Sequence, residues 1–210
     1  MISNKIKNII FDFDGVILDS VSIKTEAYKV LFEEFPKEVV NEIVKYHELN
    51  GGISRYKKIE YFFNKLLNRY ISEQEVLEYA NKYSEITKEE LSKENYLIED
   101  SLTFIKQNYN RFNMHIASGA DENDLKYICE KVNLTKYFLS ISGSPKVKSE
   151  IIKEILIYFN YKKSETILIG DSINDYEAST NNKIRFYGYN SKKLKEKFKY
   201  IDSLSLIDFD

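Results

Sequence analysis

The sequence predicts an α/β fold: a parallel sheet with helices on both faces and an all-helical segment inserted after the first strand. Short apolar runs alternate with single amphipathic helical patterns in the second half of the chain, which is typical of βαβ units. The stretch from about 20 to 95 differs, because its apolar residues recur at helical spacing and it has no convincing strand.

The strands of the sheet are predicted from five apolar runs bounded by turn residues. They cover residues 7–13, 112–118, 137–142, 165–170 and 184–188. Between them, "DENDLKYICEKVNL" and "KSEIIKEILIYF" each place their apolar residues on one helical face. Ligands of parallel α/β sheets bind beyond the carboxyl ends of the strands, so functional residues are expected there.

The inserted segment is predicted to hold four helices. Their patterns span 21–35, 37–49, 53–70 and 72–91, and Ser72 with Glu75 forms a capping box at the start of the fourth. We therefore expect two domains, an α/β core over 1–17 and 97–210 and a helical cap over 18–96.

Composition indicates a soluble globular protein. Residues are 43% hydrophobic and 30% charged, and the net charge of −2 gives no electrostatic case for a nucleic-acid or membrane partner. No apolar stretch approaches the roughly 20 residues of a membrane helix. Cys129 is the single cysteine, so no internal disulfide can form, and the N-terminus lacks a signal-peptide pattern. These features predict a cytoplasmic protein, and we expect a monomer.

Charged and hydroxyl side chains follow four of the predicted strands. In chain order they are Asp12 and Asp14, then Ser118, then Lys146 and Lys148, then Asp171 and Asp175. Clustered carboxylates repel one another, and a bound cation removes that objection. Mg²⁺ prefers few carboxylates together with phosphate oxygens, so the pattern predicts a magnesium and phosphate site.

Four ordered segments of the chain resemble the motifs of the haloacid dehalogenase superfamily of phosphohydrolases. They are "DFDGVILDS", "IASGA", "SPKVKSEII" and "IGDSINDYEAS". The helical insert resembles the cap of the β-phosphoglucomutase and phosphoglycolate phosphatase branch. The resemblance implies a Rossmann-like core with a cap, and a Mg²⁺-dependent phosphatase that hydrolyses a small-molecule phosphate ester through an aspartyl phosphate.

The resemblance also implies roles for the acidic residues. Asp12 would be the nucleophile and a metal ligand. Asp14 would act as general acid and then general base, and its backbone carbonyl would bind the metal. Asp171 would be the third metal ligand, and Asp175 would support the site through the lysine or a metal-bound water. Asp19 is expected only to fix the loop that leads into the cap.

Three groups are expected to bind phosphate. Ser118 and Gly119 would donate their hydroxyl and backbone N–H, although Asp121 is an equally good cap for the following helix. The phosphate-binding lysine is Lys148 or Lys146, and the offset of Lys148 to Asp171 favours Lys148.

The cap offers Arg55, in "LNGGISRYKK", as a ligand for a distal phosphate or carboxylate. The alternative for Arg55 is an ordinary surface arginine at a helix start. His47, His115 and Cys129 are expected to pack rather than react. The basic run at 191–200 predicts a solvated amphipathic helix.

Three other functions fit parts of the pattern. A phosphosugar mutase of the same fold would carry glutamate before the last-motif aspartate, where this chain has Gly170. A nucleotide-sugar transferase would explain Asp12 and Asp14 but not "IGDSINDYEAS". A non-catalytic binding module would be expected to lack some of the motif side chains.

Overall fold

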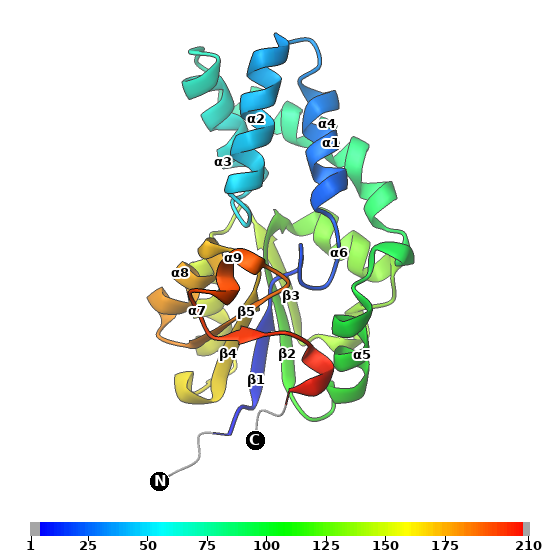
Figure 1. Cartoon of the computed structure of the whole chain (residues 1–210), viewed down its shortest axis with the longest axis vertical. Helices are drawn as coiled ribbons and strands as arrows, with labels where there is room; N and C mark the ends of the chain where they lie inside the picture. Colours follow the sequence, from blue (N-terminus) through cyan, green and yellow to red (C-terminus); the bar gives the residue numbers. More distant parts are fainter. Residues whose placement is uncertain (1–4, 208–210) are drawn as a thin grey trace.

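The computed structural model describes residues 5–207 and contains the predicted parallel sheet (Figure 1). Its strand order is β3-β2-β1-β4-β5-β6, and every pairing is parallel. The strands are β1 Asn8–Phe11, β2 Asn113–Asp121, β3 Ser140–Ser144, β4 Thr166–Gly170, β5 Arg185–Tyr189 and β6 Tyr200–Ile201. The α/β fold class is confirmed, and the chain order reverses direction at β1, between β2 and β4.

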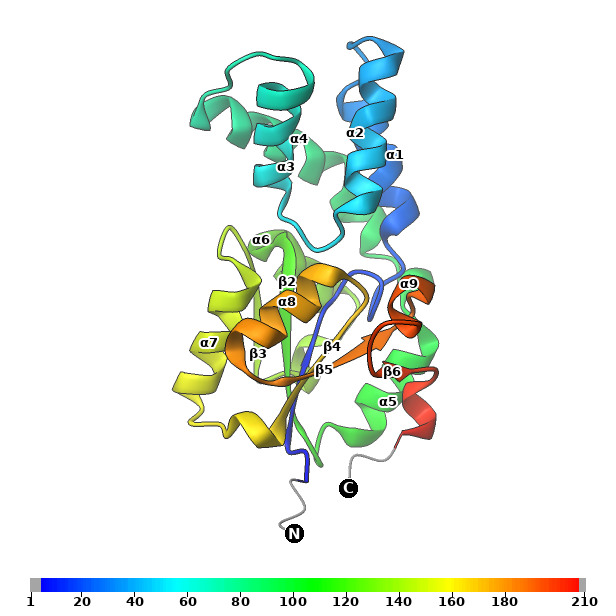
Figure 2. The same cartoon turned by 60° about the vertical axis from the view of Figure 1, so that its left-hand side comes forward.

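Helices bury both faces of the sheet, as the nearly continuous apolar strands require. Ile9 and Phe11 of β1 belong to a core on one face, and Ile10 between them belongs to the core on the other face. The helices of the core are α5 Glu99–Asn108 and α6 Glu122–Lys131 on the first face, and α7 Lys148–Tyr158 and α8 Ile173–Asn182 on the second (Figure 2).

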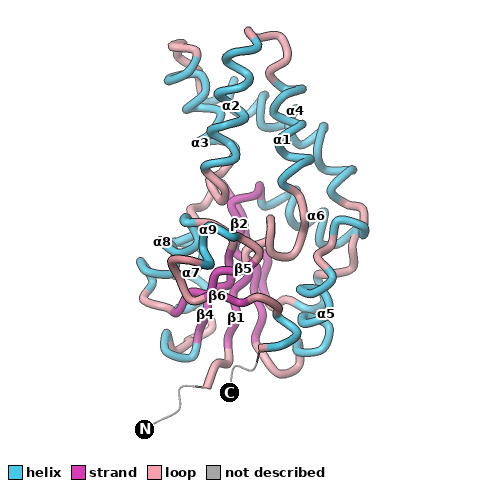
Figure 3. The backbone as a smooth tube through the Cα atoms, in the orientation of Figure 1, coloured by secondary structure: helices cyan, strands magenta, loops and turns pink. Residues whose placement is uncertain are grey.

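The inserted helices lie together beyond the carboxyl ends of the strands (Figure 3). They are α1 Val21–Leu31, α2 Lys37–Leu49, α3 Arg55–Tyr61 and α4 Glu73–Leu91. Their apolar faces form a separate core, in which the Phe62 ring packs edge to face against Tyr28 and against Phe32. The capping box of Ser72 and Glu75 is confirmed. The exact domain boundaries at 17/18 and 96/97 stay a prediction.

The two chain crossings between sheet and insert run side by side. Leu18 and Leu97 form an isolated antiparallel bridge, and the Asp19 N–H donates to the Tyr96 carbonyl at 2.8 Å. Asp19 therefore fixes this connection through its backbone, while its side chain is exposed.

Several element boundaries differ from the prediction: α1 ends at Leu31 and not at 35, and β3 covers Ser140–Ser144 and not 137–142. The third predicted helix is α3 followed by one π-helical turn at Phe62–Leu66, so it ends before residue 70. The long C-terminal helix predicted at 191–200 is wrong. Only α9 Lys192–Lys195 is helical there, because Leu194 is buried and Tyr200 joins the edge of the sheet beside Gly188. No helix within residues 5–207 is long and apolar enough to cross a membrane.

His115 and Cys129 are buried in the core, as expected. His115 of β2 lies 2.7 Å from the Ser140 hydroxyl through Nδ1 and 3.1 Å from the Tyr161 hydroxyl through Nε2. Burial lowers the pKa of His115 to about 4, so the folded state holds the ring neutral.

Because His115 is buried as a neutral ring, we expect the free energy of unfolding to fall in acid. Its folded pKa lies below the unfolded value, so the unfolded chain binds more protons as pH falls from about 6.5 towards 4. We expect His115 to contribute a slope of up to about 1.4 kcal/mol per pH unit to the free energy of unfolding in this window. Urea denaturation of wild type and His115→Gln at several pH values measures it. Equal slopes for the two proteins would contradict the assignment.

Candidate active site

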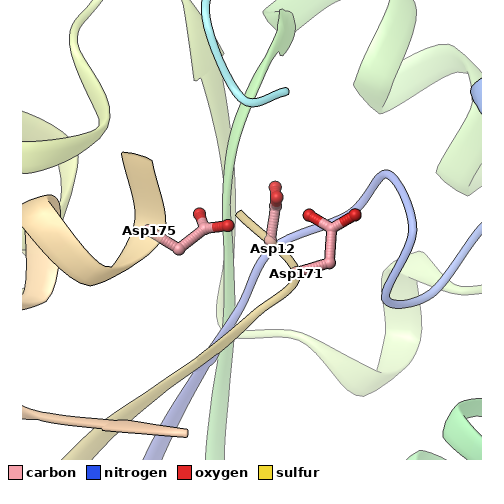
Figure 4. A group of neighbouring side chains, drawn as sticks. All are labelled: Asp12, Asp171 and Asp175. Carbon is pink, nitrogen blue, oxygen red and sulfur yellow. The ribbon is translucent and has the colours of Figure 1, made fainter. Parts of the chain in front are cut away.

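Three carboxylates meet at the carboxyl edge of the sheet, where β1 and β4 are neighbours (Figure 4). Asp12 directly follows β1, Asp171 directly follows β4, and Asp175 lies on the first turn of α8. One oxygen of each lies within 4.8 Å of the others, so the group could hold a metal ion. The sequence placed these three residues at one edge, and the structure brings them together.

Lys148 connects two of these carboxylates. Its Nζ lies 2.8 Å from Asp12 Oδ1 and also contacts Asp175 Oδ1, and all three side chains are almost fully buried. Burial opposes the charge on Lys148, but Asp12 and Asp175 raise its pKa above the ordinary value. Lys146 instead pairs with Glu154 at the surface, 2.5 Å away. Of the two candidates, Lys148 is therefore the lysine that lies in the site.

Asp175 has both oxygens occupied. The oxygen that does not contact Lys148 accepts from the Ser172 N–H at 3.0 Å and from the Ser172 hydroxyl at 2.6 Å, which caps α8. Asp171 makes no hydrogen bond or ion pair to any residue between 5 and 207. An unpartnered, partly buried carboxylate beside Asp12 is the group in this cluster most available to a cation.

The pKa values show the cost of this clustering. Burial and the charge of Asp175 raise the pKa of Asp12 to about 7, although Lys148 opposes the shift. Burial and the charge of Asp12 raise the pKa of Asp171 well above its ordinary value. A bound divalent cation would reverse both shifts, and an all-oxygen donor set suits a hard cation such as Mg²⁺.

Asp14 lies two residues after Asp12, in the loop that follows β1, and residues at the start of the insert hold its side chain. Lys24 Nζ lies 2.5 Å from Asp14 Oδ2, and the Ser20 hydroxyl donates to Oδ1 at 2.6 Å. Burial favours the neutral acid. The charge of Lys24 and the hydrogen bonds from Lys24 and Ser20 nevertheless lower the pKa of Asp14 below its ordinary value.

Gly15 makes the close packing of these aspartates possible. Its φ is +76°, and a Cβ at this position would lie 2.1 Å from Asp171 Oδ2. Any side chain at residue 15 would therefore displace Asp171.

A cavity of about 450 Å³ extends from the carboxylates to the inner side of the insert. Gly119 lines it at the end of β2, and a Cβ there would lie 2.2 Å from the Gly52 carbonyl oxygen of the α2–α3 loop. Ser118 is buried beside it, and its hydroxyl accepts from the Ala120 N–H at 3.1 Å. Asp121 caps α6, because its side chain accepts hydrogen bonds from N–H groups in the first turn of that helix. This is the capping role that the sequence predicts as the alternative.

Arg55 lines the cavity, but its guanidinium is already neutralised. Nη1 lies 2.8 Å from Asp124 Oδ2, and it donates a hydrogen bond to the Ser84 hydroxyl oxygen at 2.5 Å. Arg55 is only 7% exposed, so it is not the ordinary surface arginine of the alternative interpretation. Its pairing joins α3 of the insert to α6 of the core, and binding of a distal anion by Arg55 stays a prediction.

Sequence reasoning missed three polar residues of the cavity wall. They are Lys24, His47 and Lys58, none of which was expected to line a cavity. The available signal was spacing: Lys24 is four residues after Ser20, and Lys58 is three after Arg55, so each lies on the same helical side as a residue near the site.

Solved structures confirm the fold at low sequence identity. β-Phosphoglucomutase from Clostridium difficile matches with a TM-score of 0.77 and 19% identity, covering 97% of this chain and 94% of that chain. A predicted phosphatase from Clostridium acetobutylicum gives 0.76 and 19%, covering 96% and 95%. A predicted phosphoglycolate phosphatase from Haemophilus somnus gives 0.74 and 13%, covering 98% and 97%.

No curated protein sequence matches the chain significantly. The family model described as haloacid dehalogenase-like hydrolase matches residues 9–189, which include all four motifs and the insert between the first two. The chain belongs to the haloacid dehalogenase-like hydrolase family.

Proposed function

We propose that the chain is a Mg²⁺-dependent phosphatase that hydrolyses a small phosphorylated metabolite through an aspartyl phosphate on Asp12. One observation carries the proposal. The Asp12 carboxylate lies between a buried lysine and the unpartnered carboxylate of Asp171, and it lines the 450 Å³ cavity. A nucleophile thus lies in contact with a cation for the phosphoryl group and beside a metal ligand.

The metal would be held by Asp12, Asp171 and the backbone carbonyl of Asp14. When bound, Mg²⁺ would supply positive charge that stabilises the transferring phosphoryl group and favours ionised Asp12. The residues fit this role because Asp171 has no hydrogen-bond or ion-pair partner among residues 5–207, and because burial and Asp175 raise the pKa of Asp12 to about 7.

The reaction needs two displacements at phosphorus. A carboxylate oxygen of Asp12 attacks, the ester P–O bond breaks, and Asp14 donates the proton that the leaving alkoxide takes. Lys24 and Ser20 lower the pKa of Asp14 in the free chain, so Asp14 takes up this proton from solvent when the phosphate dianion binds beside it, because a neighbouring negative charge raises the pKa of a carboxyl group. Asp14 then accepts a proton from a water that attacks the aspartyl phosphate, which releases inorganic phosphate and restores Asp12. Lys148, the Ser118 hydroxyl and the Gly119 N–H would bind the phosphoryl oxygens. Lys24 and Ser20 position the Asp14 carboxylate.

Hydrolysis is favoured over a mutase reaction by the position before Asp171. The mutase pattern has glutamate there, whereas a Cβ on Gly170 would lie 2.4 Å from the Cβ of Asp175. A glutamate cannot occupy this position unless Asp175 moves away from Lys148. The names of the similar structures include both phosphatases and a mutase, which supports a small phosphorylated substrate in either case.

Asp12→Asn should abolish turnover. An amide cannot form the covalent intermediate, so kcat/KM for p-nitrophenyl phosphate should fall roughly 10³-fold or more. EDTA should remove wild-type activity, and added Mg²⁺ should restore it. The matched control is Asp19→Asn on the same loop, whose exposed side chain should leave kcat/KM within about twofold. Normal turnover by Asp12→Asn would contradict the assignment of Asp12 as the nucleophile.

The fate of the phosphoryl group separates hydrolase from mutase. With a hexose 1-phosphate and Mg²⁺, ³¹P NMR should show inorganic phosphate growing as the ester signal falls. Accumulation of hexose 6-phosphate with little inorganic phosphate would instead establish phosphoryl transfer between sugar hydroxyls.

The contact between the α2–α3 loop and β2 should matter for catalysis. Gly119→Ala keeps the backbone N–H but forces the Gly52 carbonyl away, so water can reach the cavity and kcat/KM should fall about tenfold or more. Gly51→Ala is the control, because its Cβ would meet only Ser172 Cβ at an ordinary 3.6 Å. Equal kinetics for the two variants would show that this contact has no role.

A further inference from the structure

Lys58 is a buried cation on the insert side of the cavity. It lies on α3, is 3% exposed, and lines the same cavity as Asp12 and Asp14. Its Nζ lies 2.9 Å from His47 Nδ1 and 3.4 Å from the His47 carbonyl oxygen. Both contacts are to uncharged groups, so neither neutralises the ammonium.

The other buried or half-buried cations around the cavity have carboxylate partners. Lys24 pairs with Asp14, Arg55 with Asp124, and Lys148 with Asp12 and Asp175. Lys58 has no carboxylate within 4.0 Å in the described part of the chain. A buried charge without a counter-charge is costly, and in a cavity the missing partner can come from a ligand.

His47 adds a second donor beside Lys58. Burial and the charge of Lys58 lower the pKa of His47 to about 3, so the ring is neutral. Nδ1 accepts from the Lys58 ammonium, which leaves the ring proton on Nε2. His47 lines the cavity as well, and Nε2 makes no hydrogen bond to any residue from 5 to 207.

We propose that Lys58 and His47 form a second anion site on the insert, so that the substrate carries a carboxylate or a second phosphate besides the phosphate that reacts. The inference rests on the proposed function for the reacting phosphate. The charge that the prediction gave to Arg55 is thus supplied by Lys58, because Arg55 is committed to Asp124.

The electrostatics of Lys58 agree with this assignment. Burial, and after it the charge of Lys24, lowers the pKa of Lys58 to about 7, with Asp14 partly opposing the shift. A ligand anion at Nζ would favour the ammonium and form charge-assisted hydrogen bonds with it.

The test compares ligand pairs that differ only in the second anion. Isothermal titration calorimetry would use the full chain as Asp12→Asn with Mg²⁺, so that no ligand is turned over. The carboxylate pair is 3-phosphoglycerate against glycerol 3-phosphate, and the phosphate pair is fructose 1,6-bisphosphate against fructose 6-phosphate. In at least one pair, the two-anion member should bind about tenfold tighter or more, and that pair identifies the anion.

Adding Lys58→Met should bring that ratio close to one. The apolar side chain replaces a buried unpaired charge, so the melting temperature should stay the same or rise. If this variant does not fold, Lys58→Gln removes the charge and keeps a donor for His47. The control Lys65→Met, at an exposed position after α3, should keep the wild-type ratio.

Two results would overturn the inference. One is equal or absent binding of both members in both pairs. The other is a preference that survives removal of the Lys58 charge. Because binding is measured without turnover, a chain that hydrolyses no ester but still prefers two anions through Lys58 would refute the phosphatase and leave the anion site standing.

Discussion

The contact of Lys148 with Asp12 and Asp175 is the interaction on which the site depends. It joins the end of β1, the start of α7 and the first turn of α8, three segments that are far apart in sequence. Removing one partner from such a buried group typically lowers the free energy of unfolding by about 3–5 kcal/mol, because the remaining charges are buried without a partner and are not solvated. The lysine therefore holds the Asp12 and Asp175 carboxylates together, and the pairing of β1 with β4 brings Asp171 beside them.

A second set of contacts joins the insert to the core without using the three clustered carboxylates. Arg55 pairs with Asp124, and the Tyr56 hydroxyl donates to Asp121 Oδ2 at 2.6 Å. The Asn174 amide donates to the Gly51 carbonyl at 2.5 Å. These bonds hold the α2–α3 loop over the cavity, so this wall of the cavity is positioned by groups outside the cluster of Asp12, Asp171 and Asp175.

The core of this arrangement could be predicted from the sequence because it is written locally. Asp12, Asp14, Gly15 and Asp171 directly follow apolar strands, and parallel strands bring their carboxyl ends to one edge. The partner of Arg55 could not be predicted, because the 68 residues between it and Asp124 leave no periodic signal. Lys58 was missed since a lysine in a helix ordinarily points to solvent. The strand β6 was missed because two residues carry no alternation.

The paired crossings at Leu18 and Leu97 have a consequence for how such a protein can change. They are held by main-chain hydrogen bonds, including one from the Ile98 N–H to the Ile17 carbonyl at 2.9 Å. Main-chain bonds do not depend on which side chains the insert carries. The helical segment beyond Lys24 can therefore acquire a different lining while the connection to the sheet, and the carboxylates that follow β1 and β4, keep their alignment.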